Sequence, residues 1–216
     1  GSEMCIRDRQ PKSLVSWLTF DLANTLYAFV IPGLYFSVWL VEEQGWTDQQ
    51  QGWATSSAML IVAILGPWLG IKSDSSNGKK KYLLVTTLIC IIAVFFLGTF
   101  SVLTSVLLFV ISLVEFNLGS VVYDALITSV SDDTKRGEIS GLGVAFGYIG
   151  SLIGFTVATI LLNNGLSYIE IFRTVALLFL MFSIPAFLFI DEKKFSDKKS
   201  KVNISQSLKI IYKSWQ

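Results

Sequence analysis

Two apolar stretches of the sequence carry polar side chains in positions where a helix would bury them. In the first, Asp21, Asn24 and Thr25 are spaced i, i+3, i+4, so they share one stripe of a helix. Tyr27 stands on the flank of that stripe. It is either an aromatic packed against a neighbouring helix with its hydroxyl bonded, or part of a substrate path.

The second stretch has Glu115 and Asn117 near its middle, and Ser120 and Asp124 continue the Asn117 face. The sequence contains no histidine, so a moving proton would have to be carried by a carboxylate whose protonation is favoured by desolvation. In a membrane each such carboxylate costs about 3 kcal/mol to insert, and it therefore requires a partner, an aqueous cavity or a proton.

These carboxylates differ in their predicted depth. Asp21 and Asp124 lie nearer the inner ends of their helices, where the alternative to a functional role is hydration or bonding to a helix end. Glu115 lies deeper, which leaves fewer such alternatives. The sequence favours Asp21 for a substrate and gate network and Glu115 for ion coupling.

The composition indicates whether these residues are surrounded by water or by lipid. The chain of 216 residues is 52% hydrophobic and 15% charged, with a mean hydropathy of +0.60, and its charges are clustered. Apolar stretches approach or exceed the roughly 20 residues that cross a bilayer as a helix. The sequence therefore predicts an all-α membrane protein with six transmembrane helices, over about 14–41, 51–71, 82–100, 102–127, 139–162 and 171–190.

The weakest boundary separates the third and fourth of these helices. A single helix from Tyr82 to Ile127 would be about 69 Å long, more than twice the thickness of the hydrocarbon core. The chain must therefore turn within it, and the interrupting residues are Gly98, Thr99, Ser101, Thr104 and Ser105.

Basic residues are distributed unevenly among the connecting segments. With the N-terminus inside, 16 of the 17 lysines and arginines fall in inner segments, and only Arg173 lies near an outer end. Because cytoplasmic segments are enriched in lysine and arginine, this asymmetry predicts that both termini are cytoplasmic. The expected location is the plasma (inner) membrane, which the chain crosses several times.

A glycine-rich stretch, SGLGVAFGYIGSLIG, occupies residues 140–154. Each interior glycine costs a water-exposed helix roughly 1 kcal/mol relative to alanine, so five of them need a compensating reason. The spacing of Gly141, Gly143 and Gly147 resembles some dinucleotide-binding turns. However, the charged segment 128–138 upstream is unsuited to the strand that such a turn follows.

Close packing of membrane helices is the favoured explanation, because association in lipid depends on close backbone approach. The residues concerned form G-x-x-x-G pairs: Gly143, Gly147, Gly150 and Gly154. Lining of a substrate path is the second interpretation. Pro32-Gly33 and Gly66-Pro67 interrupt two other helices, either as static kinks or as hinges.

Three motifs resemble the vacuole-effluxer (autophagy-related amino-acid exporter) branch of the major facilitator superfamily. Residues 20–27, FDLANTLY, resemble the Y-D-x-A-N-S-x-Y signature of its first helix. Residues 123–127, YDALI, are similar to Y-N-A-L-L at the end of helix four, with Asp124 replacing the asparagine. Residues 140–150 are similar to S-G-x-G-x-A-x-G-Y-x-G on helix five. The resemblance covers about 13–191.

A fourth resemblance is partial and falls in segment 70–81, GIKSDSSNGKKK. The superfamily loop between helices two and three reads G-x-x-x-D-R-x-G-R-R, and the matching positions here are Gly70, Asp74, Gly78, Lys79 and Lys80. One residue is inserted, and no arginine follows the aspartate. The resemblance implies a cytoplasmic gating loop that lacks the arginine which makes the gating salt bridge in relatives.

The resemblance also implies an architecture of twelve helices in two six-helix halves, with alternating access to a substrate between them. The chain has one half, so we interpret it as the N-terminal half of a longer transporter; a six-helix protein that dimerises is the alternative. Residues 13–191 would form the bundle and 192–216 a lysine-rich cytoplasmic central linker. Residues 1–12 are set apart as a leader that could be an expression or assembly remnant.

The expected function is secondary active transport of small solutes, and the resemblance implies amino acids. A sugar and cation symporter of the same superfamily is one alternative, since that branch also has an aspartate in helix one. A non-transporting membrane scaffold is another, but a scaffold gains nothing from buried carboxylates. The expected partners are the lipid bilayer, a small-molecule substrate, a proton or sodium ion, and the C-terminal half or a second copy. Enzymatic activity, a cofactor, a metal and nucleic acid are not expected.

Overall fold

The computed structural model describes residues 2–75, 78–130 and 134–190, and these residues form helices and turns without a strand. Within these described residues, five helices are long and apolar enough to cross a membrane. A further apolar helix, α4, has 17 residues and is about 26 Å long at 1.5 Å per residue. The prediction of an all-α protein with six membrane helices is confirmed.

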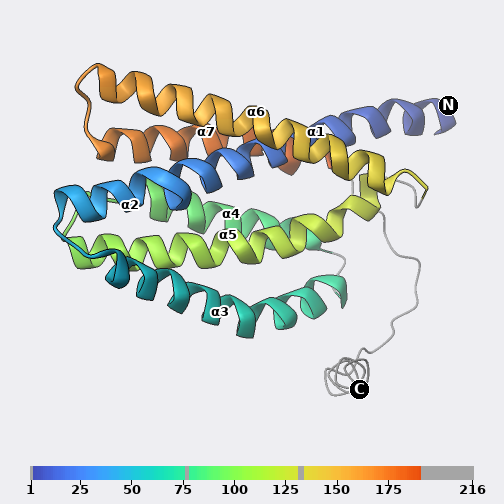
Figure 1. Cartoon of the computed structure of the whole chain (residues 1–216). Coiled ribbons are helices and arrows are strands. Elements are labelled where there is room, and N and C mark those ends of the chain that lie inside the picture. Colours follow the sequence, from blue (N-terminus) through green and yellow to red (C-terminus); the bar gives the residue numbers. More distant parts are fainter. Residues whose placement is uncertain (1, 76–77, 131–133, 191–216) are drawn as a thin grey trace.

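The helices run along a common direction as one bundle (Figure 1). The first span is built from α1, η1, α2 and η2, and the remaining spans are single helices. Their bounds are Ser2–Val30 for α1, Ile31–Tyr35 for η1, Phe36–Val38 for α2, Trp39–Glu43 for η2, Asp48–Ser75 for α3, Lys79–Phe95 for α4, Val102–Val130 for α5, Arg136–Asn163 for α6 and Tyr168–Phe189 for α7.

The predicted turn between the third and fourth spans is also confirmed, but it begins earlier than expected. The third span was predicted to reach residue 100, whereas α4 ends at Phe95. Gly98 adopts a φ of +73°, a left-handed conformation that few other residues tolerate, and its backbone N–H donates to the Ser105 hydroxyl over 3.1 Å. The chain can therefore reverse within six residues although its apolar character continues.

Helix pairing follows a repeated pattern. In Figure 1, α1 and α5 lie between α6 and α3, with α7 and α4 behind them. The principal partners of α1 are α6 and α7, and those of α5 are α3 and α4, while α4 and α7 pack against each other. Exchanging α1 with α5, α3 with α6 and α4 with α7 preserves these pairings, as expected of two nested three-helix units.

Aromatic side chains fill the space between these helices. Phe36 of α2 stacks on Phe109 of α5 with ring centroids 4.1 Å apart, and Phe20 of α1 packs near Phe179 of α7 at 6.4 Å. All four side chains are buried. Within the largely aliphatic core, these rings join the first span to α5 and α7.

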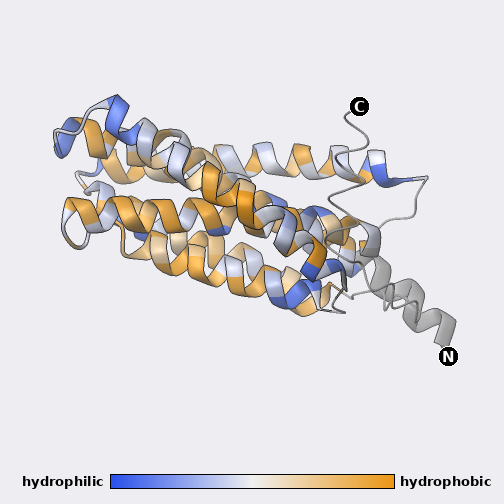
Figure 2. Cartoon of the chain, turned by 90° about the horizontal axis from the view of Figure 1, so that it is seen from below, coloured by the Kyte–Doolittle hydropathy of each residue, from blue (hydrophilic) through white to orange (hydrophobic). Residues whose placement is uncertain are grey.

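Apolar side chains also cover much of the outside. On α3, Trp53 is 69% exposed and Leu60 65%, and on α6, Tyr148 is 69% exposed and Leu152 66%. Figure 2 shows the hydrophilic residues gathered toward the ends of the bundle, with hydrophobic residues along its middle. Such an exterior is suited to lipid or to another apolar surface rather than to water.

The two proline-glycine sites differ in structure. Pro32 and Gly33 lie in η1, a π-helical turn, where a Cβ on Gly33 would approach the Ala28 carbonyl oxygen to 3.0 Å. Pro67 lies inside α3, which continues across it. Whether either site moves stays a prediction, as does the division into leader, bundle and linker. Residues 192–216, the predicted linker, lie outside the described residues.

Candidate functional site

Polar side chains of α1 and α5 meet along one line, which we call the polar seam: Asp21, Asn24, Ser120 and Asp124. The Asn24 amide donates to the Ser120 hydroxyl over 3.4 Å, which joins the two helices. The carboxylates of Asp21 and Asp124 are close enough to repel each other. Asp21 is half-buried and Asp124 exposed, so the pair is not enclosed within the bundle.

An aromatic pair forms the end of the seam that lies nearer the start of α1. The rings of Trp17 and Tyr123 stack with centroids 4.7 Å apart, and the Tyr123 hydroxyl donates to the Trp17 carbonyl over 3.1 Å. Both side chains are buried, and Tyr123 lies near both seam carboxylates. Sequence reasoning did not single out Trp17, although it stands one turn before Asp21 on the same face.

Tyr27 lies inside the half rather than on the seam surface. Its side chain is fully buried, and its hydroxyl lies 3.0 Å from the Ser112 hydroxyl of α5. Its ring packs on Phe116 at 4.8 Å and on Phe179 at 5.5 Å. This arrangement agrees with the interpretation of Tyr27 as an aromatic residue packed against neighbouring helices. It gives a substrate little access to the Tyr27 side chain.

Asn117 and Thr25 occupy the borders of the seam. The Asn117 amide donates to the Leu113 carbonyl of its own helix over 2.7 Å, while its side chain stays half-buried. Thr25 lies against α6, where a Cβ on Gly147 would come within 2.7 Å of its hydroxyl oxygen. Thr25 therefore connects the seam to the glycine-rich helix.

Glu115 lies apart from these residues. It is separated from Asn117 by two positions, about 200° around α5, and it shares a face with Gly119. A Cβ on Gly119 would lie 3.0 Å from the Thr86 hydroxyl of α4, so this face meets α4. Cys90, also of α4, lies near the half-buried Glu115. The structure brings Asp21 and Asp124 together and leaves Glu115 on the opposite side of α5.

The four glycines selected from the sequence all lie on the face of α6 that contacts α1. A Cβ on Gly143 would come within 2.7 Å of an Asp21 carboxylate oxygen, and one on Gly154 within 2.6 Å of the Val30 side chain. At Gly150 the obstacle is backbone, because the Leu22 carbonyl oxygen would be 2.2 Å away. These separations are shorter than carbon and oxygen atoms tolerate, so α1 can lie at this distance only against glycine.

Comparison with known proteins identifies the family of the chain. Residues 18–215 match the model of the Major Facilitator Superfamily. The chain belongs to that superfamily. Membership makes it an integral, multi-pass membrane protein of a transporter family.

Two curated relatives are similar to the chain, and one of them is named for the superfamily. An uncharacterized MFS-type transporter, YxiO, of Bacillus subtilis (strain 168) is 30% identical over 159 residues, which cover 68% of this chain and 37% of the relative. An uncharacterized protein of Aquifex aeolicus (strain VF5) is 26% identical over 203 residues, covering 90% of this chain and 50% of the relative. The chain thus matches half or less of the length of these curated relatives.

The segment that was expected to resemble the superfamily's loop between helices two and three runs from the end of α3 to the start of α4. Gly70 lies in α3 near Val121 of α5, and Gly78 precedes the first residue of α4. The Lys79 ammonium pairs with the Asp74 carboxylate over 2.7 Å, and the Lys80 ammonium donates to the Ile190 carbonyl over 2.9 Å. A lysine thus pairs with the loop aspartate, which is not followed by arginine in this chain.

Proposed function

We propose that the chain is the N-terminal half of a secondary active transporter that moves a small solute by alternating access. The polar seam is the observation that carries this proposal, because it sets two carboxylates and an amide between apolar helices. In a membrane such groups are costly unless they meet a solute, an ion or water. Substrate sites of this type of transporter lie near the midplane, between repeated units.

Ion coupling is proposed to use the seam carboxylates. Two neighbouring negative charges in a medium of low dielectric constant repel each other, and one proton or one sodium ion would relieve that repulsion. Binding of a proton or sodium ion to Asp21 and Asp124 would therefore respond to the gradient of that ion. A half that rocks while the ion is bound, and again after its release, would couple the gradient to solute movement.

Amino acids are the proposed substrates, on the basis of the vacuole-effluxer motifs at residues 20–27, 123–127 and 140–150. A sugar and cation symporter is the second candidate. It is favoured by Asp21, a carboxylate of the first helix that the structure places beside a second carboxylate. The two candidates differ in substrate but share a coupling ion.

The proposed setting is the plasma (inner) membrane, with both termini in the cytoplasm. The positive charge of the inner segments supports this orientation. The C-terminal six-helix half of the same full-length chain, or a second copy of this one, would supply the other wall of the path. The exposed apolar faces of α3 and α6 are suited to contact with lipid or with that wall.

The test is flux in liposomes with the full-length protein encoded by the complete open reading frame. Radiolabelled amino acids and sugars are offered separately, under an imposed proton gradient, an imposed sodium gradient, or neither. We expect saturable uptake of one class that is accelerated by one gradient and abolished by the corresponding ionophore. Ionophore-sensitive uptake of sugars alone would favour the symporter candidate, and absence of flux of either class would contradict both.

A further inference from the structure

The first turn of α4 is Lys79, Lys80 and Lys81, three consecutive lysines at the N-terminus of a helix. The N-terminus carries the positive end of the helix macrodipole, so cations there are unfavourable. No acidic residue stands in this turn to compensate. The three ammonium groups therefore need partners outside α4, or solvent.

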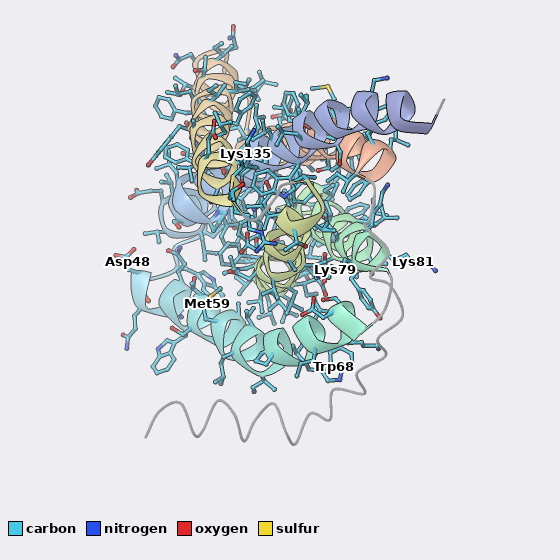
Figure 3. All side chains as sticks on the ribbon, turned by 90° about the vertical axis from the view of Figure 1, so that its right-hand side faces the viewer. Asp48, Met59, Trp68, Lys79, Lys81 and Lys135 are labelled. Carbon is cyan, nitrogen blue, oxygen red and sulfur yellow. The ribbon has the colours of Figure 1, made fainter. Side chains whose placement is uncertain are left out.

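Successive residues of a helix point about 100° apart, which sends the three lysines in three directions. Lys79 pairs with Asp74 in the last turn of α3, and its side chain is only 16% exposed. Lys80 reaches α7, where its ammonium lies 2.9 Å from the Ile190 carbonyl oxygen. Lys81 is exposed and points away from the bundle, whereas Lys79 lies nearer its centre (Figure 3).

The contact of Lys80 is placed where a cation stabilises a helix. Ile190 is the C-cap of α7, and its N–H bonds to Ala186. The last carbonyls of a helix lack partners within it and form the negative end of its macrodipole, so an ammonium group there is favourable. Ile190 is 1% exposed and Lys80 is half-buried, so water has limited access to the contact.

We propose that Lys80 is a positioning residue that clamps the inner end of α7 to the gating loop. Lys79 holds α3 to α4, and Lys80 holds α4 to α7, so adjacent residues tie the cytoplasmic ends of three helices together. Ile190 also stands two residues before the predicted linker to the other half, which begins at residue 192. If the proposed transport function holds, the clamp makes the linker follow the loop when the half rocks.

Thiol labelling of a cysteine at Ile190 tests the clamp. The Ile190→Cys substitution keeps the backbone carbonyl that accepts from Lys80. The full-length protein, with its native cysteines replaced, is reacted with a maleimide in membranes. Four versions are compared: Lys80 intact, Lys80→Met, Lys80→Arg and Lys81→Met.

We expect slow labelling with Lys80 intact and at least about tenfold faster labelling in Lys80→Met, since a charge-assisted hydrogen bond is lost while the side chain becomes only one atom shorter. Lys80→Arg should restore slow labelling, because a donor remains. Lys81→Met, the matched control, should label as slowly as the parent. Equal rates in Lys80→Met and the parent, or equal acceleration in Lys81→Met, would overturn the clamp.

A transport readout separates the clamp from its consequence. In the flux assay, Lys80→Met should lower the maximal rate several-fold with KM unchanged, because the residue touches no substrate, and Lys80→Arg should recover the rate. Faster labelling with unaltered flux would leave the clamp in place and overturn its role in rocking. Because the labelling result does not depend on flux, a protein that transports nothing would contradict the proposed function alone.

Discussion

The backbone carbonyl of Leu22 in α1 occupies the space that a side chain on Gly150 of α6 would need. A Cβ at Gly150 would lie 2.2 Å from that oxygen and 2.9 Å from its carbon. Neither atom can rotate away, because both belong to the backbone of a helix. The two helices are therefore in contact through backbone at this point, which is the closest association that membrane helices achieve.

This contact predicts a difference in sign between two alanine substitutions. Gly150→Ala should force α1 and α6 apart and destabilise the protein by roughly 1–3 kcal/mol, the range for an overpacked core. Gly141→Ala, in the same helix, has no atom within 4 Å of its Cβ and should be neutral or stabilising by up to about 1 kcal/mol through helix propensity.

The thermal unfolding midpoint, Tm, of the purified protein in detergent measures both effects. Gly141 is a better control than the loop residue Gly165, which has open space but a φ of +77° that strains any other residue. If Gly150→Ala unfolds at the same temperature as Gly141→Ala, the glycines are not explained by packing.

The buried pair of Tyr27 and Ser112 predicts unequal effects of removing either partner. In Tyr27→Phe the Ser112 hydroxyl still donates to the Phe109 carbonyl over 2.8 Å, so the cost should be about 0.5–1.5 kcal/mol. Ser112→Ala leaves the buried tyrosine hydroxyl with the Cys90 thiol, a weak hydrogen-bonding group, at a cost of about 1–3 kcal/mol.

Chemical unfolding of the two single variants and the double variant gives the comparison. The double variant should be more stable than Ser112→Ala, because it removes the hydroxyl that the single substitution leaves unpaired. Additive losses would show that the two hydroxyls do not depend on each other. A change in substrate affinity in Tyr27→Phe, with an unchanged Tm, would instead favour a place for Tyr27 in the substrate path.

The charge asymmetry predicts the orientation in the membrane. Single cysteines introduced at Gly78 or Lys135 should react with a membrane-impermeant maleimide only after the cytoplasmic side is opened, whereas one at Gln44 should react in intact cells. Lys135 and Gln44 lie at opposite ends of the bundle, next to α6 and η2. Labelling of Gln44 from the cytoplasmic side alone would reverse the proposed orientation.

The sequence was sufficient for the helices because their main signal is local. Apolar length marks a membrane helix wherever it occurs, and the i, i+4 spacing of Gly143 and Gly147 already places them on one face. The end of α4 was less predictable, since Phe96, Leu97 and Phe100 continue the apolar pattern through a turn. Hydropathy measures burial in lipid, and it does not record where the backbone reverses.

The partners of the polar residues depend on packing between distant segments. Tyr27 and Ser112 are 85 positions apart, and no pattern in either helix selects the other. Helical spacing does show that Glu115 and Asn117 face in different directions. Which neighbour each face meets follows only from the arrangement of α1, α3 and α4 around α5.

That arrangement changes the expectation for the carboxylates. Asp21 lies beside Asp124 in the polar seam, whereas Glu115 faces α4 on the other side of α5. We therefore expect Asp21→Asn in the full-length protein to lose gradient-driven accumulation at least about tenfold while retaining substrate exchange. The amide keeps the shape and most of the hydrogen bonding of the carboxylate but cannot take up a proton or balance a sodium ion.

Glu115→Gln is the matched control, because it makes the same chemical change in a half-buried carboxylate outside the seam. Accumulation and exchange of labelled substrate are measured in the same liposomes, with the pH and sodium dependence of each. Loss of accumulation in Glu115→Gln, with Asp21→Asn unaffected, would move coupling to the face of α5 that meets α4. If both variants accumulate substrate as the parent does, the carboxylates are structural, and the ion must be coupled through the other wall of the path.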